Sequence, residues 1–253
     1  MIATPTNFDE PYLERFFQAL MGLDYPKKDL RFVAVIGSDT PLKILRKYCN
    51  THLASECIVF KEQKKWRPRG VSLKADIYED LVSCIKDEEY VFFIDSDVVT
   101  LPKTLLTDLI AYDKDIIAPY VYHENTNIFY DTYIFRREGK KFPLIPPKQD
   151  ELIEMDSVGT CMLAKSKVAK ECPFKNPHHW LHFCYFAREK GYHIYAAPTL
   201  RIDHELLVDE PPHFSFDQQV ELGYIDVNEC IRRGVFSTSD LQRYEKIIGK
   251  KLQ

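Results

Sequence analysis

The stretch Tyr90-Val91-Phe92-Phe93-Ile94-Asp95-Ser96-Asp97 decides the fold class. Its five consecutive apolar residues predict a buried strand of the kind found in parallel sheets. Two aspartates follow at the carboxyl end, which is the edge where open α/β sheets bind their ligands. Residues i and i+2 of an extended chain point to the same side, so we expect Asp95 and Asp97 to present their carboxylates together.

This pair of carboxylates suits a hard divalent cation, Mg²⁺ or Mn²⁺. A cation held there can offset the charge of a departing diphosphate. The simpler alternative is a strand-to-helix turn in which Asp97 or Thr100 caps a helix that starts at Pro102. The position directly after a buried strand favours the metal-binding interpretation.

Strand and helix patterns alternate along the first half of the chain. Strands are expected at residues 1–6, 31–37, 57–60 and 116–122, and helices after Asp9, from Thr40, over 73–85 and from Pro102. This alternation is typical of βαβ units. We therefore expect the α/β class, with a single Rossmann-like domain whose central sheet is mostly parallel and flanked by helices.

The pattern changes after residue 122. The sequence predicts strands over 129–137 and 151–164, helices from Ser166 and over 180–190, strands over 192–196 and 200–202, and further helices in the tail from residue 206. Strands 129–137 and 151–164 would form a smaller β element, joined by the Pro- and Lys-rich loop 140–150. No internal repeat or low-complexity linker separates two domains.

Composition excludes several classes of protein. The 253 residues carry 34 basic and 38 acidic side chains, a net charge of −4, which disfavours nucleic acid as a partner. No apolar run approaches the roughly 18 residues of a membrane helix, and no signal peptide is apparent at the start. The seven cysteines contain no C-x-x-C pair, which indicates a reducing compartment and no structural zinc.

The chain resembles the nucleotide-sugar glycosyltransferases of the A-type fold, whose hallmark is an Asp-x-Asp motif after a buried strand. Four further segments extend the resemblance over residues 1–205: the strand 1–7, the Lys-bearing helix 70–81, the A-R-x-x-G-Y-x-I segment 187–194, and Asp203-His204-Glu205. The resemblance implies a catalytic domain over 1–205, with a nucleotide-sugar half (1–122) and an acceptor half (123–205). Residues 206–253 would form a C-terminal helical extension.

The resemblance also implies roles for individual residues. Asp95, Asp97 and His204 would hold Mn²⁺ or Mg²⁺, and the donor would be a UDP- or GDP-linked sugar. The residues implied to contact this nucleotide sugar are Thr4, Pro5, Thr6, Asp39, Lys74, Asp95 and Ser96, with Arg67 and Arg69 as further phosphate contacts. The alternatives are that His204 is a loop histidine and that Lys74 lies on a helix surface.

One departure from the family concerns the general base. Inverting members carry an acidic pair at the start of the late helix, where this chain has His179-Trp180-Leu181-His182. Three interpretations stay open: His179 or His182 acts as the base, Asp156 does so, or the enzyme retains configuration and needs no such base. We favour retention. Gly159 would allow close backbone approach near the acceptor, and Trp180 would be a sugar platform or a core residue.

The expected function is therefore a metal-dependent glycosyltransferase acting on a hydroxyl of a glycan, lipid or protein. A sugar nucleotidyltransferase is an alternative, but residues 6–10 lack the Gly-rich basic loop of that class. A catalytically inactive nucleotide-sugar-binding module is another, favoured by the missing carboxylate. The expected location is cytoplasmic, and the basic residues of the tail would permit peripheral contact with a membrane.

Overall fold

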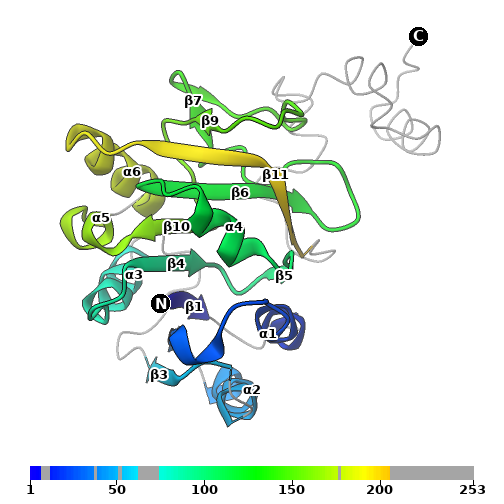
Figure 1. Cartoon of the computed structure of the whole chain (residues 1–253), viewed down its shortest axis with the longest axis vertical. Helices are drawn as coiled ribbons and strands as arrows, with labels where there is room; N and C mark the ends of the chain where they lie inside the picture. The colour runs from blue at the N-terminus through cyan, green and yellow to red at the C-terminus, as the bar shows by residue number, and fades with distance from the viewer. Residues whose placement is uncertain (7–11, 37–38, 51–52, 62–73, 176–177, 206–253) are drawn as a thin grey trace, which may run out of the picture.

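The structure is a computed structural model that describes residues 1–6, 12–36, 39–50, 53–61, 74–175 and 178–205 (Figure 1). The predictions for Arg67, Arg69, the side chain of Asp39 and the tail 206–253 lie outside the described residues. Within the described part of the chain, no helix is both long and apolar enough to cross a membrane.

A nine-stranded sheet forms the centre of the molecule, and Figure 1 shows its strands lying side by side from β3 through β4, β10 and β6 to β11. The spatial order is β3 (Glu56–Lys61), β2 (Arg31–Ile36), β1 (Ile2–Thr6), β4 (Tyr90–Ile94), β10 (Cys161–Lys165), β6 (Ile116–His123), β11 (Ile194–His204) and β5 (Val98–Thr100), with β9 (Ile153–Glu154) also paired to β11.

The sheet is mostly parallel, as the sequence predicts. Strands β3, β2, β1 and β4 are mutually parallel, and β6 is parallel to β11. Strand β10 runs antiparallel between β4 and β6, and β5 and β9 run antiparallel to β11. Because β10 is antiparallel to both β4 and β6, these two strands run in the same direction. Strands β4, β6 and β11 therefore all end at the same edge.

Helices cover the sheet because their apolar faces match it. They are α1 (Leu13–Met21), α2 (Asp39–Asn50), α3 (Lys74–Ser83), α4 (Leu105–Ala111), α5 (Ser166–Glu171) and α6 (His179–Glu189), with a 3₁₀ turn, η1, at Lys27–Asp29. Phe16 and Phe17 of α1 are fully buried, and Phe17 packs edge-on against Phe32 of β2. Every residue of β2 is buried, as expected for a central parallel strand.

The second half differs in detail from the sequence expectation. The strand expected over 129–137 is replaced by an isolated bridge at Phe129 and a two-stranded hairpin, β7 (Arg136–Arg137) with β8 (Lys140–Lys141). The strand expected over 151–164 is split into β9 and β10, which pair with different neighbours. The two expected strands before His204 form the single strand β11, whose pairing register to β6 shifts between Ala197 and Arg201.

Candidate active site

The carboxyl ends of β4 and β11 bring together two residues that are far apart in the sequence. Nε2 of His204, at the end of β11, lies 3.0 Å from Oδ2 of Asp97, which follows β4. The His204 side chain is only 3% exposed, whereas that of Asp97 keeps 27% of its surface accessible. The pair therefore has one member anchored in the protein and one that a ligand can reach.

Two contacts fix the His204 ring, one at its Nδ1 and one at its face. Its Nδ1 lies 2.8 Å from the carbonyl oxygen of Glu205. The ring stacks on Tyr130 with centroids 3.6 Å apart. A carbonyl at Nδ1 favours a proton there, which leaves Nε2 as the nitrogen directed at Asp97.

Asp97 and His204 stabilise each other's charged form. Burial is the largest single influence on both groups and opposes their ionisation. The charge and hydrogen bond of His204, together with the charge of Lys74, nevertheless lower the pKa of Asp97. The charge and hydrogen bond of Asp97, together with the Glu205 carbonyl and the charge of Asp95, likewise raise the pKa of His204 against the effect of burial.

The two aspartates are not related by the alternation of an extended strand. The chain turns directly after β4, and the amide of Val98 donates to the carbonyl of Asp95 at 3.3 Å. The argument from i and i+2 positions is therefore wrong, although the charges of Asp95 and Asp97 still act on each other. The turn brings the two side chains to the edge, and β5 then leads the chain away.

Asp95 is fixed through both its backbone and its side chain. Its amide donates to the carbonyl oxygen of Thr160 at 2.8 Å, and Oδ1 accepts a hydrogen bond from the Tyr78 hydroxyl at 2.5 Å. Burial raises the pKa of Asp95 to about 6, the Lys74 charge opposes this rise, and the charge of Asp97 adds to it.

A divalent cation fits the donor set at this edge. Oδ1 of Asp97 is buried without a hydrogen-bond partner, and Nε2 of His204 has no hydrogen bond of good geometry despite its proximity to Asp97. A carboxylate oxygen and an imidazole nitrogen both suit Mn²⁺. Within the described ranges, however, no three His, Cys, Asp or Glu side chains are arranged as a complete metal site, so solvent or substrate oxygens would supply the remaining ligands.

The residues implied for nucleotide binding lie at the same edge where the structure describes them. Thr4 and Thr6 of β1 are fully buried, and Thr6 Oγ1 has no hydrogen-bond partner. Pro5 is partly exposed and Ser96 is buried. Lys74 is the exposed first residue of α3, and its charge acts on Asp95, Asp97 and Asp131, so it lies close to the aspartates.

The three candidate general bases are placed in different ways. Asp156 uses both carboxylate oxygens: Oδ2 accepts from the Gly139 amide at 2.6 Å, and Oδ1 lies 2.9 Å from Nη1 of Arg188. His182 has Nδ1 2.8 Å from the Lys175 carbonyl. His179 is buried, which lowers its pKa to about 3, and its Nε2 has no partner.

Trp180 and Gly159 belong to the packing beneath the site. Trp180 is 3% exposed, which supports the core role over a sugar platform. A Cβ on Gly159 would lie 2.6 Å from Cγ2 of Ile134 and 3.1 Å from the Trp180 ring. Gly159 thus allows close approach, as expected, but the neighbours in this structure are side chains of the core.

Sequence reasoning missed a third carboxylate beside the site, the buried Asp131. Asp131 accepts a hydrogen bond from Thr160 Oγ1 at 2.6 Å and one from the Ile134 amide at 3.2 Å. Burial raises its pKa. Thr160 has a φ of +56°, a strained conformation for a β-branched residue. Nothing in the sequence around Asp131 marked this residue as buried.

Tyr78 and His123 were also missed. Tyr78 lies in the apolar pattern of α3, so its sequence context indicates core packing and gives no sign of the bond to Asp95. His123 ends β6 directly beside His204, and its Nδ1 is buried without a partner. Burial, together with the charge of His204, lowers the pKa of His123 to about 4. Only the pairing of β6 with β11 reveals this neighbour.

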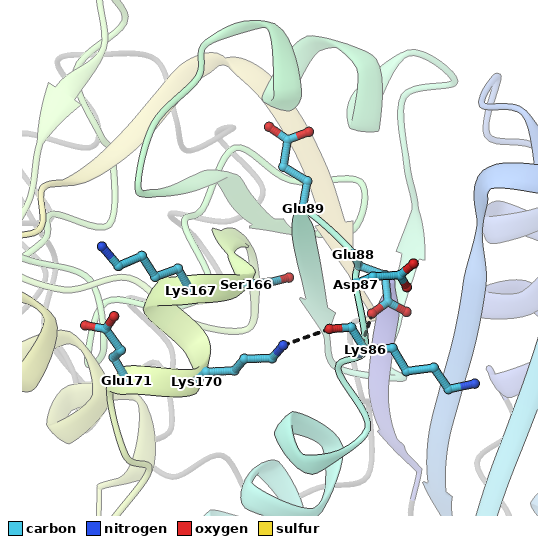
Figure 2. Close-up of a pocket in the computed structure, with 8 residues that line it drawn as sticks. All are labelled: Lys86, Asp87, Glu88, Glu89, Ser166, Lys167, Lys170 and Glu171. Carbon is cyan, nitrogen blue, oxygen red and sulfur yellow. Dashed lines mark hydrogen bonds between the residues drawn. The ribbon is translucent and has the colours of Figure 1, made fainter.

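The opposite edge of the sheet carries a separate pocket of about 490 Å³ between the start of β4 and α5. Figure 2 shows its charged lining, in which Lys170 Nζ donates to the Lys86 carbonyl at 2.8 Å. The pocket is lined by Lys86, Asp87, Glu88, Glu89, Ser166, Lys167, Lys170 and Glu171. None of the predicted site residues lies there, and charges of both signs line it, which favours no single class of ligand.

Comparison with known proteins agrees with the resemblance. The profile of the Anp1 family, a mannosyltransferase family, matches residues 79–141, which include β4, Asp95, Asp97 and β6. No curated protein matches the chain significantly.

Solved structures of glycosyltransferases share the architecture. Residues 1–349 of S. aureus TarS superpose with a TM-score of 0.56 at 15% identity, over 81% of this chain and 60% of that one. The same TarS segment in complex with UDP gives 0.53 at 16% identity. GalNAc-T7, solved with UDP, GalNAc and Mn²⁺, gives 0.57 at 10% identity, over 99% of this chain and 55% of that one.

The chain spans 55–60% of the length of these structures, and 36% of the longer TarS structure. At identities of 10–16%, the likeness establishes the fold. The protein therefore has the A-type glycosyltransferase fold, as the resemblance of its sequence to that group implied.

Proposed function

We propose that the protein is a metal-dependent glycosyltransferase that moves a sugar from a nucleoside diphosphate sugar to a hydroxyl of a glycan, lipid or protein. The observation that carries this proposal is the Asp97–His204 pair, 3.0 Å apart at the carboxyl edge. The fold supports it, because structures of the same architecture were solved with UDP, and one of them with Mn²⁺.

Asp97 and His204 would hold Mn²⁺ or Mg²⁺, with Asp95 as the second carboxylate of the site. Such a cation, when bound, offsets negative charge on the departing diphosphate. Asp97 offers a buried oxygen without a partner, and the Glu205 carbonyl keeps the His204 ring in place. The protein thus provides the orientation in advance.

The donor would lie between the end of β1 and the start of α3. Lys74 is an exposed ammonium beside two carboxylates, so it would meet the negative charge of a diphosphate. Thr4, Pro5, Thr6, Asp39 and Ser96 remain the candidates for base and ribose contacts.

Retention of configuration is the mechanism we favour. Both carboxylate oxygens of Asp156 are engaged, and burial lowers the pKa of His179 to about 3, which makes it a weak base. His182 has one ring nitrogen engaged by a carbonyl and is the remaining candidate if the reaction inverts. Product stereochemistry, read by nuclear magnetic resonance of the anomeric proton, distinguishes the two mechanisms.

The decisive test measures transfer or donor hydrolysis with a panel of UDP- and GDP-sugars, GDP-mannose included, in MnCl₂ and after chelation by EDTA. Parent protein should be active only with metal, and Asp97→Ala should lose at least about 100-fold in kcat/KM.

Asp87→Ala is the matched control, because Asp87 is an exposed aspartate at the opposite edge of the sheet. It should keep parental activity. Equal activity of Asp97→Ala and Asp87→Ala would refute the metal role. Binding of UDP or GDP without turnover would instead support an inactive binding module. The cytoplasmic location and the membrane contact of the tail stay predictions.

A further inference from the structure

The hydroxyl of Tyr78 is a buried polar group that the mechanism above does not use. Tyr78 is fully buried in α3, among aromatic side chains. Its ring contacts Phe93, Phe174, His179 and Trp180, with centroids 4.4–5.9 Å apart. A phenylalanine would fill nearly the same volume, and a buried hydroxyl costs free energy unless it is hydrogen-bonded.

The hydroxyl has one strong partner. It donates to Oδ1 of Asp95 at 2.5 Å, which is the short distance of a hydrogen bond to a charged acceptor. The Asp95 amide is meanwhile held by the Thr160 carbonyl. Since Tyr78 engages Oδ1, Oδ2 is the Asp95 oxygen that remains for a ligand.

The ring of Tyr78 connects this carboxylate to the start of α6. His179, the first residue of α6, stacks on it with an interplanar angle of 15°, and Trp180 follows at 4.4 Å between centroids. One side chain therefore contacts both Asp95 and the first two residues of α6.

We propose that Tyr78 is a positioning residue that orients Asp95 for the nucleotide sugar and fixes the start of α6 relative to it. This inference rests on the proposed function, because it takes Asp95 as part of the donor site. Tyr78 itself does not touch the reacting atoms.

The test compares Tyr78→Phe with Tyr120→Phe. Tyr120 is equally buried, but its hydroxyl has no hydrogen-bond partner, so its loss removes only a buried polar atom. Calorimetric titration with MnCl₂ plus UDP or GDP should give a Kd for Tyr78→Phe that is at least about tenfold higher than that of the parent. Tyr120→Phe should keep the parental Kd.

Two further variants separate positioning from packing. The effect of Tyr78→Phe should largely disappear in an Asp95→Asn background, because the hydroxyl acts through that carboxylate. Replacing Tyr78 with 4-aminophenylalanine, which keeps a ring-borne N–H donor, should restore binding to within about threefold of the parent.

Three outcomes would overturn the inference: parental binding by Tyr78→Phe, an undiminished effect in the Asp95→Asn background, or a Tyr78→Phe chain that fails to fold. Asp97→Ala distinguishes this failure from failure of the proposed function. If Asp97→Ala loses metal-dependent binding while Tyr78→Phe keeps it, only the role of Tyr78 is refuted.

Discussion

The two edges of the central sheet differ in which charged side chains they bury. At the amino edge, Lys86, Asp87 and Glu89 are exposed, and the buried Arg31 is paired with Glu88 at 2.9 Å. At the carboxyl edge, Asp97 and His204 lie 3.0 Å apart, and Asp131 is buried beside them. Burying ionisable groups costs folding free energy. The carboxyl edge combines several such groups with an Asp97 side chain that stays 27% exposed, so a ligand is expected there.

Two histidines at the opposite ends of strand β11 differ in the same way. His193 directly precedes it and is 62% exposed, with Nδ1 2.8 Å from Glu154. His204 ends the strand and is 3% exposed against Asp97. The residue type is the same, and only the position along the strand differs. The neighbours provided by β4 and β6 therefore decide whether a histidine of this region can serve as a ligand.

The largest expected effect comes from replacing each of these two histidines by alanine in turn. His204→Ala should reduce metal-dependent kcat/KM by about 100-fold, because it removes the anchored imidazole beside Asp97. His193→Ala should stay within about twofold of the parent, since surface pairs contribute little. Steady-state kinetics with titrated MnCl₂ measure both. Similar losses in the two variants would remove the distinction between the edges.

A second, smaller effect is expected from the two glycines near these edges. Gly159→Ala should reduce the free energy of unfolding by about 1–3 kcal/mol, because the added Cβ would meet Ile134 and Trp180. It should also weaken nucleotide binding, since neighbouring Thr160 holds the Asp95 amide. Urea unfolding and calorimetry report the two quantities.

Gly191→Ala is the control for that substitution. Gly191 precedes His193 with a φ of +83° and no atom within 4 Å of an added Cβ. Backbone strain should cost about 1–2 kcal/mol of stability, with nucleotide binding unchanged. If Gly159→Ala leaves binding unchanged as well, the packing beneath the carboxyl edge does not control the site.

The smallest expected effect concerns Asp131 and depends on pH. Because burial raises the pKa of folded Asp131, ionising it penalises the folded state. Asp131→Asn should therefore be more stable than the parent at pH 8. The advantage should shrink as the pH falls through the folded pKa, and vanish below about pH 4, the pKa of an unfolded aspartate.

Urea unfolding measures this difference over a pH range from about 3.5, just below the pKa of an unfolded aspartate, to about 8. Asp87→Asn, at the exposed edge, should change the unfolding free energy by less than about 0.5 kcal/mol at any pH. A stability gain that stays constant with pH would show that the ionisation of Asp131 is not its cause.

Much of the fold was predictable because it depends on local patterns. The apolar run 90–94 forms β4, the strands predicted over 31–37 and 116–122 appear as β2 (Arg31–Ile36) and β6 (Ile116–His123), and Pro102 precedes helix α4. The splitting of 151–164 into β9 and β10 was not predictable. The segment carries no clear break signal between its halves, and only long-range pairing assigns them to different neighbours.

The sequence indicates which residues are candidates for the site, but not how they are arranged. Asp95 and Asp97 stand out because they directly follow a buried strand, and His204 because the resemblance implies it as a metal ligand. Their arrangement through a turn, a stacked Tyr130 and a bond from Tyr78 could not be read from spacing. Tyr78 looks like any apolar-face residue of a helix, because its hydroxyl acquires a role only when α3 packs beside β4.

By itself, the sequence determined that this is an α/β chain with carboxylates at a ligand-binding edge, since hydrophobic periodicity and strand ends are local properties. The tertiary structure alone decided that His204 meets Asp97, that Asp131 is buried, and that Tyr78 bonds to Asp95. Those contacts join residues 17 to more than 100 positions apart. They form only where strand order and helix packing exclude water and bring the chain ends of the strands together.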